Sequence, residues 1–240
     1  ILENQNLEKR IAITPEISKK YSSLGFKVLL PTGYGNHLGF KDEEYEKSGT
    51  QISKDEKEIL NSANVIVQLG FPSDEKISSL TDNLTLVGFL DPYNNEEKIK
   101  GLVKKKINVF SLELLPRITR AQSMDILSSQ ANLAGYKAVI ESFAHFEKAI
   151  PMMMTAAGTI SAAKVLVVGA GVAGLQAIAT AKRMGAIVFA TDVRMASKEQ
   201  GESFGGKLLP VEEAENLETD GGYAKEAAED RRKRKAARVR

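Results

Sequence analysis

The stretch KVLVVGAGVAGLQAIATAKRMGAIVFATD, residues 164–192, constrains the fold more than any other part of the chain. The apolar run Lys164–Val168 predicts a buried strand, Val172–Met184 predicts an alanine-rich helix, and Ile187–Thr191 predicts the next strand. The loop GAGVAG joins the first strand to the helix. A strand, a glycine-rich turn, a helix and a second strand in this register are typical of the βαβ unit of a parallel, doubly wound sheet.

Each glycine of this loop has a physical role in holding a dinucleotide. Gly169 permits the tight turn, Gly171 lets backbone approach a pyrophosphate, and Gly174 lets helix and strand pack closely. Asp192, 18 residues after Gly174, can accept hydrogen bonds from the adenosine ribose and would repel a 2′-phosphate. Arg194 could in principle accommodate that phosphate, but Asp192 occupies the deciding position. We therefore expect NAD(H) rather than NADP(H); the alternative is a structural turn that holds no ligand.

The residues before this unit alternate short apolar runs with charged helical stretches, the pattern of a parallel α/β domain. The expected strands are 26–30, 64–69, 84–90 and 107–112, and the expected helices are Glu16–Leu24, Asp55–Leu60 and Glu96–Lys105. A long helix is expected over 125–148. The fold class that follows is α/β, with two doubly wound Rossmann-like domains, residues 1–126 and 127–240, joined by the long helix, the second domain truncated.

Composition excludes several other classes of protein. The 33 basic and 31 acidic residues nearly cancel, giving a formal charge of +2. The chain has no cysteine, so it has no disulfide framework and no thiolate metal site, and we expect no metal. No run of 18 or more apolar residues is present, so we expect no membrane-spanning segment. Because the chain begins at Ile1 and shows no signal-peptide pattern, it reads as a fragment or a processed protein.

The polar stretch RITRAQSMDILSSQ, residues 117–130, lies just before the long helix. One interpretation is a solvated helix start, capped by Ser123 or Thr119. The other is that these side chains line the site and face the nicotinamide end of a dinucleotide bound at the glycine loop. The residue types alone leave both interpretations open.

Longer motifs resemble a known family. PRITRAQSMDILSSQANLAGYKAVIE, TAAG, KVLVVGAGVAGLQAIATAKRMGAIVFATDVR and GGYAKE occur in this order. Together they resemble the NAD(H)-binding domain at the start of the alpha subunit of proton-translocating nicotinamide nucleotide transhydrogenases, in the alanine dehydrogenase/transhydrogenase family. The resemblance runs from EKRIAITPE to about Ala228. The RxTRAQSMD motif is specific to that family, whereas GAGVAG is shared with many dehydrogenases.

The resemblance implies roles for individual residues. Arg117, Gln122, Asp125 and Ser128 match the polar loop that contacts the nicotinamide carboxamide and its ribose, and Gln122 is expected close to both nucleotides during hydride transfer. The catalytic group implied is Gln122, Asp125 and Arg117. Loop and ribose contacts are implied for Val172 and Asp192, and Tyr223 in GGYAK matches the tyrosine of a mobile loop that closes over the nucleotide.

The resemblance also implies the cofactors and partners. NAD(H) would bind here and NADP(H) on a partner domain, so that hydride passes directly between two nicotinamide rings without an acid–base pair. The partners implied are that NADP(H)-binding domain, a transmembrane subunit or domain that couples the exchange to proton translocation, and a second copy in a homodimer; no nucleic acid is expected. The domain would lie at the cytoplasmic or matrix face of an energy-transducing membrane. The two histidines, His37 and His145, are interpreted as structural or solvated.

Two alternatives and one departure remain. An alanine dehydrogenase shares the RIAITPE-like start with its substrate arginine, here Arg10, but this resemblance would place a catalytic lysine at Gln68 and a histidine at Asp91, and both are missing. A nucleotide-sensing module without turnover is the other alternative. The resemblance decays after Ala228, and the tail RRKRKAARVR has seven basic residues in ten. That tail could form an anionic-lipid or nucleic-acid patch, but we interpret it as a non-native or truncated end.

Overall fold

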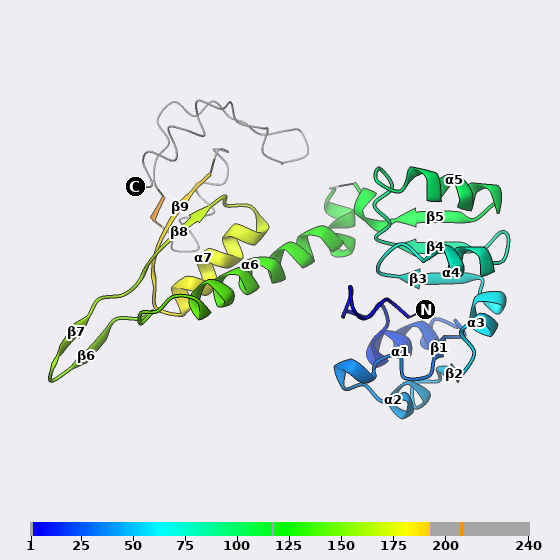
Figure 1. Cartoon of the computed structure of the whole chain (residues 1–240), viewed down its shortest axis with the longest axis horizontal. Helices are drawn as coiled ribbons and strands as arrows, with labels where there is room; N and C mark the ends of the chain where they lie inside the picture. The colour runs from blue at the N-terminus through cyan, green and yellow to red at the C-terminus, as the bar shows by residue number, and fades with distance from the viewer. Residues whose placement is uncertain (1, 117, 193–206, 209–240) are drawn as a thin grey trace. The chain divides into compact units, whose positions relative to one another are not determined.

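The computed structural model describes residues 2–116, 118–192 and 207–208 of the chain. These residues form one compact unit that ends at Met124 and a second that begins at Asp125 (Figure 1). The domain boundary expected between 126 and 127 stays a prediction. The basic tail lies outside the described residues.

The first unit alternates short helices with parallel strands. The helices are α1 Pro15–Ser23, α2 Asp42–Glu46, α3 Glu56–Ser62, α4 Asp74–Ser79 and α5 Glu96–Lys104, with 3₁₀ turns η1 Asn36–Leu38, η2 Leu112–Leu114 and η3 Thr119–Met124. The strands are β1 Leu29–Pro31, β2 Gln51–Ser53, β3 Val65–Gln68, β4 Thr85–Gly88 and β5 Asn108–Ser111. β1 pairs with β2, and β3, β4 and β5 form a three-stranded sheet in that order, all in parallel.

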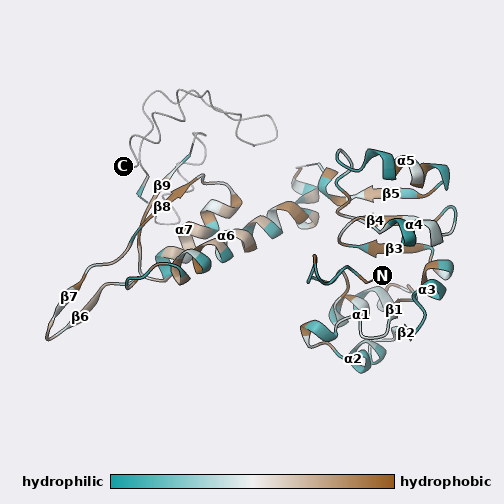
Figure 2. Ribbon diagram, viewed as in Figure 1, coloured by the Kyte–Doolittle hydropathy of each residue, from teal (hydrophilic) through white to brown (hydrophobic). Residues whose placement is uncertain are grey.

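Two apolar clusters hold the first unit together. Leu86 of β4 and Leu102 of α5 are fully buried in the cluster around the three-stranded sheet, and burying each contributes roughly 1.5–3 kcal/mol. Figure 2 shows β3 and β5 as hydrophobic and the outside of α5 as largely hydrophilic. In the second cluster the hydroxyl of Tyr45 donates to the carbonyl of Ile13 at 3.0 Å, and the edge of its ring meets Tyr34. Burial raises the pKa of the Tyr45 hydroxyl well above its ordinary value.

The second unit contains the long helix and the glycine loop. Its elements are α6 Ile126–Ala144, β6 Met153–Thr155, β7 Gly158–Ile160, β8 Lys164–Val168, α7 Val172–Arg183, β9 Ile187–Thr191 and β10 Lys207–Leu208. The strands β10, β9 and β8 form a parallel sheet in that order, and β6 and β7 form a separate antiparallel hairpin. Figure 1 shows α6 and α7 side by side, with the hairpin extending away from them.

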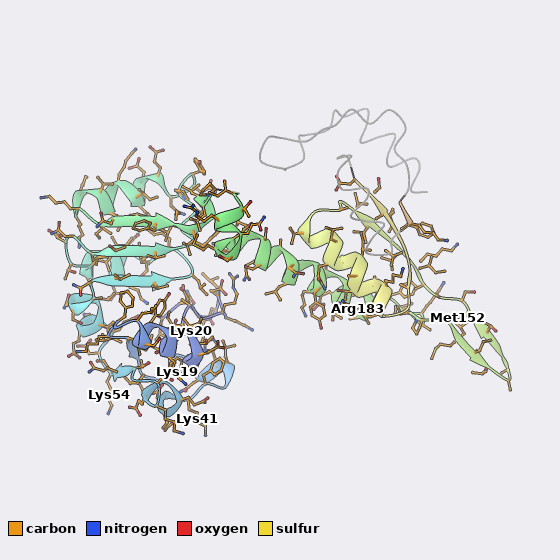
Figure 3. The ribbon with its side chains drawn as sticks, turned by 180° about the vertical axis from the view of Figure 1, so that it is seen from behind. Lys19, Lys20, Lys41, Lys54, Met152 and Arg183 are labelled. Atoms are coloured by element: carbon orange, nitrogen blue, oxygen red, sulfur yellow. The ribbon has the colours of Figure 1, made fainter. Side chains whose placement is uncertain are left out.

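The core of the second unit lies where α6, α7 and the sheet meet. Val139 of α6, Ile178 and Ala181 of α7, and Val188 of β9 are buried in one cluster. The last turn of α7 carries Arg183, labelled in Figure 3, and a cation there is favourable because the carbonyl end of a helix has a negative partial charge. This core fixes α6 and the sheet on either side of α7.

The structure differs from the sequence-based expectation in short elements. β8 and β9 have the bounds predicted, and α7 ends one residue earlier than predicted. The strand expected over 26–30 is instead β1, Leu29–Pro31, because Phe26 is 57% exposed and lies in the turn after α1. Sequence patterns missed α2, α4, β2 and the β6–β7 hairpin, since three to six residues are too few to show a helical or strand period.

Candidate functional site

The glycine loop forms a sharp turn at the carboxyl end of β8. Gly169 has a φ of +103°, a backbone conformation that costs an L side chain but not glycine. Its N–H donates to the carbonyl of Thr191, the last residue of β9, at 2.7 Å. Gly171 precedes the first turn of α7, and its carbonyl accepts from the N–H of Leu175 at 2.8 Å. The chain therefore passes from strand to helix in three residues, with the first amides of α7 at the carboxyl edge of the sheet.

Gly174 allows the closest approach in this turn. A Cβ built on Gly174 would lie 1.8 Å from the carbonyl oxygen of Gly169 and 3.6 Å from a side-chain carbon of Val167. No real Cβ tolerates the first distance, so α7 could not sit at this height above β8 with any other residue. The glycine predicted to permit close packing of helix and strand is found in that position.

Asp192 follows β9 and its side chain reaches the loop. One carboxylate oxygen accepts from the N–H of Ala170 at 2.5 Å, and Asp192 itself is only half-buried. The acid thus orients the middle of the loop and remains partly open to solvent. A carboxylate at this place can also accept hydrogen bonds from the two hydroxyls of a ribose.

These residues fit the phosphates and adenosine ribose of a dinucleotide. Gly171 brings no side chain to the start of α7, so its first N–H groups and the positive end of the helix dipole meet no capping carboxylate of that residue. The cradle exists only because Gly169 and Gly174 lack Cβ atoms. The sequence-predicted group Gly169, Gly171, Val172, Gly174 and Asp192 is brought together at this turn.

Asp125 and Ser128 lie together at the start of α6, in the same unit as the loop. Asp125 is the N-cap of α6, and one carboxylate oxygen accepts from the N–H of Ser128 at 2.9 Å. The other oxygen accepts from the Ser128 hydroxyl at 2.6 Å. The cap is therefore Asp125 rather than the Ser123 or Thr119 of the solvated-start interpretation, and this N-cap arrangement holds both side chains in a fixed geometry.

The other predicted site residues are placed differently. Gln122 lies in η3 of the first unit, and its side chain is exposed. Arg117 and Tyr223 lie outside the described residues, as does Arg194. The roles assigned to these residues stay predictions.

Gly135 is a residue that motif reasoning missed. It is buried in the middle of α6, and an added Cβ would lie 2.0 Å from the carbonyl oxygen of Ala173, in the first turn of α7. A glycine inside a helix costs roughly 0.5–1 kcal/mol relative to alanine, so its presence signals a packing requirement. That signal was available in the sequence, but it could not say which element packs there.

The positions that correspond to an alanine dehydrogenase centre offer no acid–base pair. Gln68 is 5% exposed and its amide donates to a carboxylate oxygen of Glu3 at 3.2 Å. Arg10 pairs with Glu8, and this hydrogen-bonded contact raises the pKa of Arg10 and lowers the pKa of Glu8. An amide does not titrate, and the arginine already holds an internal carboxylate. These two positions therefore do not supply the proton transfers that amino-acid oxidation requires.

Two features are absent from the described residues. Within 2–116, 118–192 and 207–208, no three His, Cys, Asp or Glu side chains gather closely enough to hold a metal ion. Over the same part of the chain, no helix combines the length and the apolar character needed to cross a membrane.

Comparison with known proteins matches two family models along the chain. Residues 1–134 match the alanine dehydrogenase/PNT N-terminal domain, and residues 138–234 match the alanine dehydrogenase/PNT C-terminal domain. A curated relative from Rickettsia prowazekii, named as an NAD(P) transhydrogenase subunit alpha, is 51% identical over 93% of this chain. The chain spans 59% of the length of that relative.

Solved structures agree with this match. The crystal structure of a transhydrogenase from Sinorhizobium meliloti superposes with a TM-score of 0.83 at 49% identity, over 88% of this chain and 63% of that one. An L-alanine dehydrogenase structure gives a TM-score of 0.74 at 20% identity, over 86% of this chain and 58% of that one, a likeness of fold alone. The predicted α/β class with Rossmann-like parallel sheets is confirmed. The chain belongs to the alanine dehydrogenase/PNT family.

Proposed function

We propose that this chain is the NAD(H)-binding component of a transhydrogenase that passes hydride between NADH and NADP⁺. The observation that carries the proposal is the turn from β8 to α7, where Gly174 approaches the Gly169 carbonyl and Asp192 reaches the loop. The similarity to proteins named transhydrogenase supports the same reaction.

The residues of the chain bind and orient; they do not need to move a proton. The amides at the start of α7 hold the pyrophosphate, and Asp192 accepts from the adenosine ribose. We assign the nicotinamide ribose and carboxamide to Asp125 and Ser128, with Arg117 and Gln122. When bound, NADH supplies the hydride from C4 of its ring to C4 of the second ring, so that NADH becomes NAD⁺ and NADP⁺ becomes NADPH. Tyr223 is assigned to closure over the bound nucleotide.

The partners are part of the proposal. A separate domain presents NADP(H), and a membrane domain couples the exchange to proton translocation, which places this chain at the cytoplasmic or matrix face of that membrane. A homodimer is supported by the β6–β7 hairpin, whose strand residues are all exposed. Met154 is 74% exposed, and Met152, labelled in Figure 3, is 61% exposed. An apolar hairpin with two open edges is a surface that pairs with another chain.

Asp192→Ala is expected to weaken NADH binding by about 1–3 kcal/mol, because ribose hydroxyls lose their acceptor. The unmodified chain should bind NADH more tightly than NADPH, since the carboxylate repels a 2′-phosphate. The measurement is calorimetric titration of both nucleotides. Equal affinity of the unmodified chain for NADH and NADPH would contradict the role of Asp192.

A second variant separates charge from loop shape. Asp192 also accepts from the Ala170 N–H, and Asp192→Asn keeps an oxygen for that bond while removing the negative charge. Asp192→Asn should therefore leave thermal stability close to that of the unmodified chain and narrow the gap between NADH and NADPH. If the gap stays the same, the preference does not come from this charge.

Gln122→Asn is expected to slow transhydrogenation more than it weakens NADH binding, because it shortens the side chain by one methylene where both rings meet. Gln122 is exposed in a short 3₁₀ turn, so the substitution should not disturb the core. The measurement is the rate at saturating nucleotide, with the NADP(H)-binding domain present, beside the Kd for NADH. An unchanged saturated rate with a raised Kd would show a binding role instead.

A further inference from the structure

Helices α6 and α7 touch at a point where backbone meets backbone. An added Cβ on Gly135 would lie 2.0 Å from the Ala173 carbonyl oxygen, 2.8 Å from its carbonyl carbon and 3.0 Å from its Cα. All three atoms are main chain, so no side-chain rotation could relieve the overlap. The crossing therefore depends on the absence of a side chain at Gly135 in α6.

The two helices run in the same direction from this crossing. Four residues after Gly135, Val139 joins the cluster of Ile178, which lies five residues after Ala173. Beyond the end of α6, Pro151 lies against Gly185, which follows α7. The first turns of α6 therefore extend past the N-terminus of α7, on the side where β8 and β9 end. In a parallel α/β sheet that is the side on which ligands bind.

We propose that Gly135 is a positioning residue that sets the distance between the dinucleotide loop and the pair Asp125–Ser128. This inference rests on the proposed function, since it takes the loop to hold the phosphates and the α6 start to face the nicotinamide half. The loop and the α6 start are borne by different helices of one unit. The crossing at Gly135 is where backbone fixes one helix against the other.

The position of Gly135 makes α6 a lever. Asp125 is ten residues before Gly135, which is about 15 Å along a helix that rises about 1.5 Å per residue. A tilt of about 5° at the crossing moves the α6 start by about 1.3 Å over that length. Displacement on the order of 1 Å is enough to spoil a reactive geometry.

The loop itself does not share this lever. Its shape is set by Gly169, Gly174 and the Asp192–Ala170 hydrogen bond, none of which involves α6. Gly135→Ala moves the nicotinamide-side groups while leaving the phosphate and adenosine contacts in place. The variant thus separates two halves of one binding site.

The test compares two ligands on the full 240-residue chain: NADH, which spans both halves, and ADP-ribose, which lacks the nicotinamide. Gly135→Ala should raise the Kd for NADH by roughly tenfold and change the Kd for ADP-ribose by less than about twofold. A matched control is Gly101→Ala in α5, another helical glycine, around which an added Cβ meets nothing within 4 Å. That control should change neither Kd.

A milder variant covers the case in which Gly135→Ala does not fold. Val139→Ile adds one methylene at the same α6–α7 interface, where Val139 is 5% exposed, and should give the same NADH-selective loss at a smaller size. Circular dichroism melts establish which variants are folded. Equal weakening of NADH and ADP-ribose, or no weakening of either by a folded variant, overturns the positioning role. Failure of the unmodified chain to bind both ligands would instead refute the proposed function.

Discussion

Gly174→Ala should abolish measurable NADH binding and lower the free energy of unfolding of the second unit by about 2–4 kcal/mol. The new Cβ would lie 1.8 Å from the Gly169 carbonyl oxygen, so α7 must move away from β8 or the loop must change its backbone angles. Either change withdraws the α7 amides from the phosphates. Each 1.4 kcal/mol of lost binding raises the Kd tenfold, so a loss well above tenfold is expected.

The measurement is NADH titration together with chemical unfolding of the full chain. Gly101→Ala again serves as the control, because it makes the same chemical change in an open position of α5 and should stabilise by about 0.5–1 kcal/mol. A Gly174→Ala chain that binds NADH as well as the unmodified chain would mean that the nucleotide does not use this turn.

Addition of the family's NADP(H)-binding domain should turn a chain that shows no hydride exchange into one that catalyses it, with a rate increase of at least about a hundredfold. The sequence holds one GxGxxG loop, at 169–174. The glycine cluster at 32–39 leads into the three-residue turn η1, which offers no helix N-terminus of useful length. One bound nucleotide cannot exchange hydride until a second ring is held about 3–3.5 Å away.

The assay mixes the chain with NADH and an NADP⁺ analogue whose reduction is followed by absorbance, with and without the partner domain. The partner domain with both nucleotides but without this chain is the necessary control. Turnover by this chain alone at the rate of the mixture would reveal a second nucleotide site. A mixture without turnover, in which both proteins still bind their nucleotides, would refute the transhydrogenase reaction while leaving NAD(H) binding in place.

The βαβ unit could be predicted from sequence because its signals are local. Runs of β-branched and aliphatic residues mark β8 and β9, and the glycine spacing between them marks the turn. Asp192 could be found by counting along the chain, since one strand separates it from the helix. The RxTRAQSMD motif likewise pointed to Asp125 and Ser128 through resemblance, and the structure places both at the start of α6.

The short elements could not be predicted for the same reason. β2 has three residues and is defined by its pairing with β1, 22 positions earlier in register. The β6–β7 hairpin has exposed methionines on a strand, which a hydropathy pattern reads as a buried segment. Pairing between distant segments, rather than local propensity, makes these residues strands.

The sequence by itself determined the order of strand, glycine turn, helix and acid, because the backbone freedom of glycine and the apolar period of a strand are properties of neighbouring residues. Only the tertiary structure decided what Gly135 does. A glycine in a helix reads as a small energetic cost until the carbonyl of Ala173, 38 residues later, is found where its Cβ would be. Contacts between backbones so far apart in the chain depend on how two helices cross, and no local pattern encodes that crossing.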